Sequence, residues 1–200
     1  MDGIHIMNEE EYWGGGAGGT WGDNVVHEST QSSSKKIPIA RDKLHINPFY
    51  RYLMCRGARK YPQTYNSHGV HTYHSKQLHH NLLFATLKKK IENVCEKWSH
   101  GHGTGYVYAM WINVTNKGGM ILPHYHNPDG ASYRITGVYY LSKPKKSGNL
   151  LIHNPDLEVV EAETDDIVLF GADMLHETEI NPTNNERISC GFNFFQNRSD

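Results

Sequence analysis

Residues 166–195 read DIVLFGADMLHETEINPTNNERISCGFNFF, and this stretch decides the fold class. It contains three short apolar or alternating segments, near 166–171, 174–180 and 187–195, separated by Gly, Pro and Asn residues. Segments of this length between such residues are typical of β-strands joined by turns. In the last segment the alternation places Ile188, Cys190, Phe192 and Phe194 on one face and Arg187, Ser189, Gly191 and Asn193 on the other.

The same period of two extends upstream, where it predicts five further strands near 105–115, 119–126, 132–142, 148–153 and 157–162. Before them, apolar residues recur at spacings of three and four from Leu83 to Trp98, which predicts an amphipathic helix. Eight short strands preceded by a helix predict a mainly β fold. We expect a double-stranded β-helix, or jelly roll, with the N-terminal helix buttressing the outer face of one sheet.

The composition is that of one globular domain with tails. The chain has 200 residues, of which 38% are hydrophobic and 20% charged, and its formal net charge is -1. This balance argues against nucleic acid or an anionic membrane as a partner. The sequence has no apolar run of the roughly 20 residues that a membrane helix needs, and its start does not resemble a signal peptide, so we expect a cytoplasmic protein. The three cysteines form no CxxC pair, which argues against a thiolate zinc site.

Two segments before the predicted helix differ in charge. Residues 1–34 hold six acidic residues, no Lys or Arg, and the run Trp13-GGGAGGT-Trp21, which predicts a flexible Gly-rich acidic arm. An aromatic-tipped lid over a site is the alternative. Residues 35–60 hold eight Lys or Arg against the single Asp42, which a solvated face or a contact with the acidic arm explains better than nucleic-acid binding. We therefore expect a single jelly-roll domain over residues 35–200.

A candidate metal site begins in LPHYHNPDGA, residues 122–131. His124 and His126 lie two residues apart on the predicted strand 119–126, so both imidazoles should project from the same face. A third histidine, His176, follows the apolar run 166–171 at the start of another predicted strand. Three neutral imidazoles suit Zn, Fe, Cu or Ni, so the type of ligand leaves the metal open.

A candidate anion site lies eleven residues after His176, where Arg187 and Ser189 share one face of the last predicted strand. A guanidinium pointing into a barrel is costly unless an anion receives it. A dicarboxylate that chelates the metal at one end and pairs with Arg187 at the other meets that demand. A structural salt bridge is the alternative, and Arg134 and Lys143 are the other candidate cations.

The order of these motifs resembles a known family. The HxH pair is followed by Gly137-VYYL-Ser142, the run 166–171, His176, Arg187-IS and Phe192-Asn193. Over roughly residues 105–196 this is similar to the 2-oxoglutarate and Fe(II)-dependent oxygenases whose metal motif is HxH in place of HxD.

The resemblance implies that His124, His126 and His176 hold Fe(II) and that Arg187 and Ser189 bind 2-oxoglutarate. The catalytic residues would be the three histidines and Arg187. His126 stands where the wider superfamily has a carboxylate, which leaves the site one negative charge short. Asp129, five residues after His124, is a minor alternative ligand.

The implied activity is that of a non-haem dioxygenase of the hydroxylase type. Its partners would be 2-oxoglutarate, O2 and a primary substrate that the sequence does not identify, with succinate and CO2 as co-products. The alternatives are a three-His metalloenzyme that does not use 2-oxoglutarate and a non-enzymatic jelly-roll binding module.

The sequence leaves other features of the site open. It does not decide whether Tyr139 or Tyr140 faces the metal, nor the oligomeric state. The remaining clustered histidines are interpreted as solvated or core residues, with the lining of the site entrance as the alternative; they are His68, His71, His74, His79, His80, His100 and His102.

Overall fold

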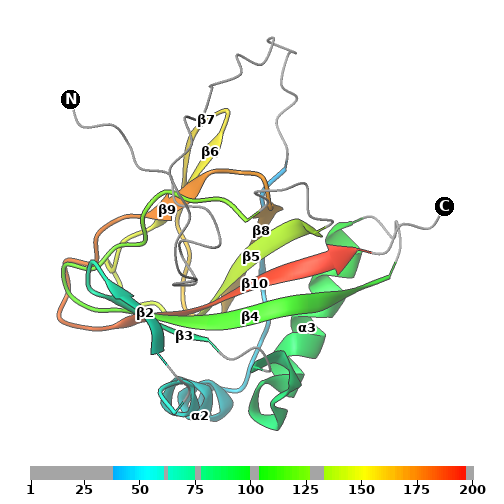
Figure 1. The fold of residues 1–200 in the computed structure, drawn as a ribbon, viewed down its shortest axis with the longest axis horizontal. Helices are drawn as coiled ribbons and strands as arrows, with labels where there is room; N and C mark the ends of the chain where they lie inside the picture. The colour runs from blue at the N-terminus through cyan, green and yellow to red at the C-terminus, as the bar shows by residue number, and fades with distance from the viewer. Residues whose placement is uncertain (1–37, 61–62, 75–77, 100–103, 127–132, 197–200) are drawn as a thin grey trace, which may run out of the picture.

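A computed structural model describes residues 38–60, 63–74, 78–99, 104–126 and 133–196 of the chain, and it contains two antiparallel sheets (Figure 1). The major sheet has the strand order β1-β8-β5-β10-β4-β3-β2 and the minor sheet the order β7-β6-β9. The major-sheet strands are β1 (Ala40–Lys43), β2 (Gln63–Ser67), β3 (Val70–His74), β4 (Gly105–Thr115), β5 (Tyr133–Ser142), β8 (Asp166–Gly171) and β10 (Arg187–Gln196). The minor-sheet strands are β6 (Leu150–Asn154), β7 (Asp156–Val160) and β9 (His176–Thr178). The predicted mainly β jelly roll is confirmed.

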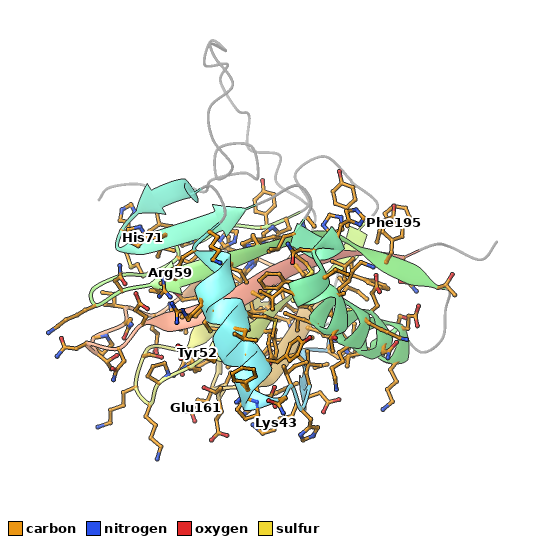
Figure 2. All side chains as sticks on the ribbon, turned by 90° about the horizontal axis from the view of Figure 1, so that it is seen from below. Lys43, Tyr52, Arg59, His71, Glu161 and Phe195 are labelled. Carbon is orange, nitrogen blue, oxygen red and sulfur yellow. The ribbon has the colours of Figure 1, made fainter. Side chains whose placement is uncertain are left out.

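Two α-helices cover the outer face of the major sheet, α2 (Pro48–Ala58) and α3 (Leu82–Trp98), with the short 3-10 helix η1 (Leu78–His80) between them in the chain (Figures 1 and 2). The side chain of Asn81 caps α3 by accepting from the Leu83 N–H. The buried positions of α3, which are Phe84, Leu87, Ile91 and Cys95, belong to the same core cluster as the outer-face residues of β4, β5 and β10. The predicted buttressing helix is thus present. No helix among the described residues is long and apolar enough to span a membrane.

The strand predicted at 119–126 is wrong. This segment runs beside β9 but forms only an isolated bridge, between His124 and His176. Pro123 has no N–H to donate to a ladder. The N–H of Ile121 is also diverted, because it donates to the Thr178 hydroxyl instead of a backbone carbonyl. The segment therefore follows the sheet edge without becoming a strand.

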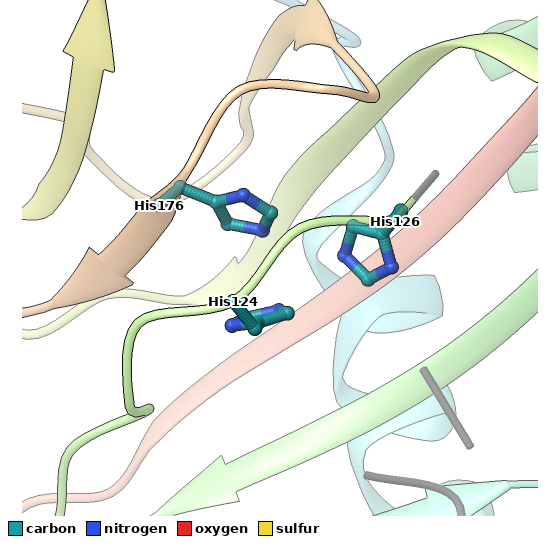
Figure 3. A group of neighbouring side chains, drawn as sticks. All are labelled: His124, His126 and His176. Carbon is teal, nitrogen blue, oxygen red and sulfur yellow. The ribbon is translucent and has the colours of Figure 1, made fainter. Parts of the chain in front are cut away.

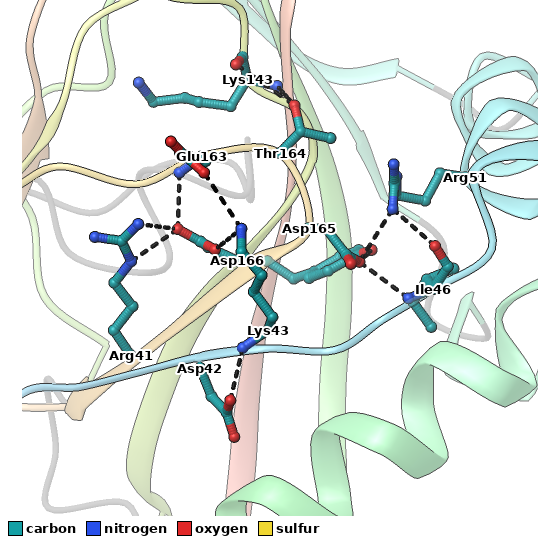
Figure 4. A network of polar contacts seen from close by, with 11 residues as sticks. Arg41, Asp42, Lys43, Ile46, Arg51, Lys143, Glu163, Thr164, Asp165 and Asp166 are labelled. Atoms are coloured by element: carbon teal, nitrogen blue, oxygen red, sulfur yellow. Dashed lines mark hydrogen bonds and ion pairs between the residues drawn. The ribbon is translucent and has the colours of Figure 1, made fainter.

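The basic segment 35–60 was not predicted to contain regular structure, but from Ala40 it forms β1 and α2. Two consecutive acidic residues at the start of β8, Asp165 and Asp166, tie this segment to the sheet (Figure 4). Buried Asp166 accepts from Arg41 Nε and Lys43 Nζ, each at 2.7 Å. Burial alone would raise the pKa of Asp166, but the hydrogen bonds from Lys43, the Glu163 N–H and Arg41 bring it below its ordinary value.

Asp165 makes the second connection, and it determines which face of β5 is turned toward the helices. Its carboxylate accepts from the hydroxyl of Tyr139 at 2.8 Å and from the Ile46 N–H at 3.0 Å. Tyr139 is therefore committed to the helix-covered layer. Because adjacent residues on a strand point to opposite faces, Tyr140 points to the space between the two sheets.

Candidate metal and co-substrate site

Three buried histidines converge between the sheets (Figure 3). His124 and His126 come from the segment beside β9, and His176 is the first residue of β9. One potential ligand atom from each lies within 4.8 Å of the others, which is a separation that a single metal ion can bridge. The expectation that the three imidazoles gather is met, although His124 and His126 are not held by a strand.

Backbone hydrogen bonds fix this arrangement. His124 N–H donates to the His176 carbonyl at 3.0 Å, and His176 N–H donates to the His124 carbonyl at 2.9 Å. His126 N–H donates to the Ala172 carbonyl at 2.9 Å. All three ligand candidates are therefore anchored on the β8–β9 connection or on β9 itself.

The ring nitrogens are oriented for metal binding. Nδ1 of His124 lies 2.8 Å from the Leu122 carbonyl, and Nδ1 of His176 lies 2.9 Å from the Met174 carbonyl. Because a carbonyl can only accept, both Nδ1 atoms carry the proton and both Nε2 atoms carry the lone pair. Such contacts to the second nitrogen are typical of metal-ligating histidines.

Burial also keeps the imidazoles in the form that binds metals. Desolvation lowers the pKa of His124 to about 4 and moves the pKa values of His126 and His176 well below the ordinary value. Neutral imidazole is the ligating form, so near neutral pH the site needs no proton to leave before a metal binds.

One unsatisfied atom fits the same interpretation. Nδ1 of His126 is buried and has no hydrogen-bond partner among the described residues. A buried polar atom of this kind calls for an ion, a water or a ligand. In the part of the chain that the structure describes, the three histidines are also the only group with metal-site spacing, so the histidines near His68 to His80 form no second one there. Asp129, His100 and His102 lie outside the described residues.

A pocket opens beside the histidines, and the major sheet forms its floor. The floor residues come from three adjacent strands: Trp111 and Asn113 of β4, Thr136, Gly137, Val138 and Tyr140 of β5, and Ser189 and Gly191 of β10. The register explains why they meet, because Ser189 pairs with Asn113 on one side and Tyr140 on the other. The empty space is about 440 Å³, part of it open to solvent.

Trp111 closes one side of this floor. Its ring centroid lies 5.2 Å from that of His126, and its ring covers the backbone of Gly191. A Cβ atom at Gly191 would lie 2.5 Å from Nε1 and Cζ2 of the indole, so only glycine permits this close approach. The indole thus packs between β10 and a candidate metal ligand.

Arg187 lies behind the pocket wall, where it contacts the lining residue Thr178, and it is only 1% exposed. Its Nη1 donates to the carbonyls of Ser147 at 2.7 Å and Glu179 at 3.3 Å, and its Nη2 donates to the hydroxyl of Thr178 at 2.8 Å. Thr178 itself lines the pocket. Among the described residues no carboxylate forms an ion pair with Arg187, so the structural salt bridge considered from the sequence is absent there. Burial lowers the pKa of its guanidinium from the ordinary value. An arginine side chain nevertheless keeps its charge in proteins.

Several hydrogen-bond donors on and near this guanidinium have no hydrogen-bond partner among the described residues. An arginine has five N–H groups, and the three hydrogen bonds leave its Nε–H and one Nη2–H without a partner among the described residues. The hydroxyls of Thr115, which pairs with Arg187 across the strands, and of Ser147 are buried and also lack a partner there. A ligand with several acceptor oxygens would satisfy such a group of donors.

Several sequence expectations can be placed on this geometry. Ser189 and Tyr140 line the pocket and Tyr139 does not. Lys143 is partly buried and its Nζ lies 5.9 Å from the centre of the Tyr140 ring, while the side chain of Arg134 lies outside the described part of the chain. Thr178 was missed, although its position two residues after His176 on one strand was a usable signal.

No protein-family model and no curated protein matches the sequence. Solved structures match the fold. HygX from Streptomyces hygroscopicus, solved with nickel and 2-oxoglutarate bound, has a TM-score of 0.66 at 10% identity over 80% of this chain and 84% of that chain. The α-ketoglutarate-dependent epimerase SnoN from nogalamycin biosynthesis has a TM-score of 0.65 at 12% identity over 80% and 79%. A prolyl-4-hydroxylase from Pseudomonas putida has a TM-score of 0.60 at 13% identity over 80% and 94%. At these identities the likeness establishes the fold alone.

Proposed function

We propose that this chain is a non-haem Fe(II) and 2-oxoglutarate-dependent oxygenase of the hydroxylase type. One observation carries the proposal: three buried neutral imidazoles line a pocket whose wall includes Thr178, and Thr178 is hydrogen-bonded to a buried guanidinium that has no carboxylate partner among the described residues. Each feature alone has a structural explanation. Together they supply a candidate metal site and, next to the pocket wall at Thr178, a candidate anion site, which is the pair of features that a short chelating dicarboxylate needs.

His124, His126 and His176 would hold the iron. The donor set fits this role, since imidazole suits iron as well as zinc, copper and nickel, and the unsatisfied Nδ1 of His126 calls for a ligand or ion. When bound with 2-oxoglutarate, iron supplies the oxidative decarboxylation that yields succinate and CO2 and allows O2 to oxidise the primary substrate.

The other residues bind and orient the co-substrate. Arg187 would receive its distal carboxylate through the N–H groups that remain available, and Thr178 fixes the guanidinium for that contact. Tyr140 contributes a neutral hydroxyl, because burial raises the pKa of its phenol to about 12. Ser189, on the same strand face as Arg187, adds a second hydroxyl. Trp111 shields the metal side of the pocket next to His126, and the apolar residues of the minor sheet pack against Tyr140.

Hydroxylation is the reaction that this pocket supports best. It requires a substrate C–H bond beside the metal but no additional acid or base from the protein. The lining residues that the structure describes include one carboxylate, Glu177, and it points to the outer face of the minor sheet, where it contacts His153. Among the residues that the structure describes, the pocket thus offers no inward carboxylate for other chemistry.

The experiment that tests this proposal is anaerobic loading of the protein with Fe(II), followed by addition of 2-oxoglutarate. We expect one Fe(II) per chain and a weak visible metal-to-ligand charge-transfer band. On admission of O2, slow formation of succinate without a primary substrate should follow. Iron binding with neither band nor succinate would reject the proposal.

A second candidate is a three-His metalloenzyme that does not use 2-oxoglutarate. The absence of a carboxylate from the described ligand group favours it, because the usual facial triad of 2-oxoglutarate enzymes contains one. The experiment above distinguishes the two candidates by the response to 2-oxoglutarate. Failure to bind any divalent metal would instead leave the non-enzymatic binding module.

A further inference from the structure

We propose that the primary substrate is a peptide in extended conformation, one of whose apolar ring side chains packs on Tyr106 and Phe195. The peptide residue that is oxidised lies beside His126, four positions away from that ring along the peptide. This inference rests on the proposed function and names the class of its substrate.

The pocket-facing side of the major sheet consists of rows of residues paired across β4, β10 and β5. Three successive rows each contribute at least one residue to the pocket lining: Asn113, Ser189 and Tyr140; Trp111, Gly191 and Val138; and Ala109, Asn193 and Thr136. In the next row Tyr106 of β4 pairs with Phe195 of β10. Because directly paired residues of an antiparallel sheet share a face, these two aromatic residues continue the floor of the pocket beyond Thr136.

A β-bulge places Tyr106 on this face. The pairing of β4 with β10 skips Tyr108, which is the extra residue of the bulge. Without it, the alternation from Trp111 would turn Val107 toward the pocket and Tyr106 toward the helices. Instead, Val107 belongs to the helix-covered core. Bulges that redirect a side chain are over-represented next to active sites, which fits a role for Tyr106 in binding.

The two rings form an open aromatic surface. Their centroids lie 5.4 Å apart and their planes are tilted by 32°. Tyr106 is 45% exposed and Phe195 is partly buried. The start of β4 and the end of β10 lie away from the strands of the minor sheet, and Phe195 marks this end of the molecule (Figures 1 and 2). Exposed aromatic side chains supply much contact area with few rotatable bonds and are enriched among the residues that dominate binding.

The spacing between this surface and the histidines fits an extended peptide. Gly191 lies against Trp111, whose ring centroid is 5.2 Å from that of His126. Phe195 follows Gly191 by four strand residues, or about 13 Å at roughly 3.3 Å per residue. An extended peptide above the sheet repeats its side chains on one face at the same interval. A residue beside His126 therefore places the side chain four positions away over Tyr106 and Phe195.

A small molecule fits this surface less well. Sites for small ligands are concave and bury most of the surface of the ligand. The row of Tyr106 and Phe195 is instead open to solvent, as the exposure of Tyr106 shows. A chain that continues past the pocket makes use of such an outer row.

The test begins with the full-length protein as purified and a phage-displayed library of random dodecapeptides. We expect enrichment of peptides that carry Phe, Tyr, Trp or Pro. The most enriched peptide is then synthesised, and its affinity is measured by calorimetry. A library without enriched peptides would overturn the inference.

Variants of the aromatic row locate the binding. Tyr106→Ser and Phe195→Ser should each weaken the synthetic peptide by about tenfold, as loss of a ring at the centre of a contact does. Tyr106→Phe should keep the affinity, because the ring remains. Tyr50→Ser is the control, since Tyr50 of α2 is 43% exposed on the helix side of the sheet, and its affinity should equal that of the wild type. Unchanged affinity in Tyr106→Ser and Phe195→Ser, or an equal loss in Tyr50→Ser, would overturn the inference.

Nuclear magnetic resonance of the bound peptide connects this surface to the histidines. Mn(II) added to the protein should broaden the signals of the peptide residue four positions from the ring more than those of the ring itself. Equal broadening along the peptide would overturn the assignment of the peptide as substrate.

The proposed function and this inference can fail separately. Succinate formation by the Fe(II)-loaded protein without capture of any peptide would keep the proposed function and overturn the inference. Peptide binding on Tyr106 and Phe195 by a protein that binds neither Mn(II) nor Fe(II) would support the peptide surface and reject the proposed function.

Discussion

Arg187 is joined to the metal-binding strand through Thr178, whose hydroxyl accepts a 2.8 Å hydrogen bond from Nη2 and which shares one face of β9 with His176. We expect Thr178→Val to weaken 2-oxoglutarate binding by about fivefold, the worth of one such hydrogen bond, and to lower iron affinity by a smaller factor, because the same hydroxyl also accepts from the Ile121 N–H of the segment that carries His124. Thr178→Ser should restore the affinity. Thr164→Val is the control, because that hydroxyl bonds to Lys143 N–H outside the pocket. Equal 2-oxoglutarate affinities in Thr178→Val and the wild type would show that Thr178 does not contribute to binding of the co-substrate.

Removing the guanidinium itself should have a larger effect. Arg187→Ala should retain iron but weaken 2-oxoglutarate by about 2–5 kcal/mol, since truncating one partner of a buried charged pair leaves the other uncompensated. The control is Arg51→Ala, which removes a partly buried arginine that pairs with Asp165 away from the pocket. Calorimetry of the iron-loaded proteins measures both. A comparable loss of affinity in Arg51→Ala would point to a general effect on the fold.

The third ligand candidate can be tested by metal content. His126→Ala should release iron about as readily as His124→Ala, whereas His126→Asp should retain it, because an anionic oxygen ligand replaces imidazole at the same position. His153→Ala removes a histidine of the outer face that is 36% exposed by side chain, and it should keep the metal. If His126→Ala binds iron and turns over 2-oxoglutarate normally, the third ligand must be sought at Asp129.

The stability of the metal-free protein should depend on pH through these histidines. Burial lowers the pKa of His124 to about 4, below the ordinary 6.5 that applies in the unfolded chain. Between these values the unfolded chain binds more protons than the folded one, so the free energy of unfolding falls as the pH drops from 6.5 toward 4. His124 alone accounts for about 3 kcal/mol of this loss. Because of the same shift, protons compete with iron for the imidazole of His124 only at a lower pH than they would at an exposed imidazole.

Urea denaturation in the presence of a chelator measures this dependence. His124→Asn should flatten the profile, because it removes the buried imidazole whose pKa is lowered. An identical slope in His124→Asn and the wild type would mean that this histidine is not held neutral by burial.

The contact between Trp111 and Gly191 should be intolerant of a methyl group. Gly191→Ala places a Cβ 2.5 Å from the indole Nε1, and such overpacking costs about 1–3 kcal/mol. Displacement of the indole should also weaken metal binding, because the ring packs against His126. Gly118→Ala is the control: its φ of 76° is strained for alanine, but no atom lies within 4 Å of the added Cβ. A loss of stability without a loss of metal affinity in Gly191→Ala would show that the packing of Trp111 does not contribute to metal binding.

The local pattern of the sequence was sufficient for the class of fold. Alternation over two residues and spacing over three or four are properties of neighbouring residues, and they predicted β4, β5, β8, β10 and α3 close to their observed bounds. The spacing of the motifs also identified His124, His126 and His176 as candidate ligands. They meet because the topology brings the segment that carries the first two beside the start of β9.

Tertiary structure decided what local pattern could not. Pro123 and the hydroxyl of Thr178 prevented a strand at 119–126, and the carboxylate of Asp165, 26 residues from Tyr139 in the chain, determined that Tyr140 faces the pocket. The burial that keeps the histidines neutral, and the lack of an ion pair for Arg187 among the described residues, likewise depend on residues distant in sequence. Periodicity is set within a strand or a helix, whereas hydrogen-bond partners, desolvation and pKa are set by what the fold brings alongside it.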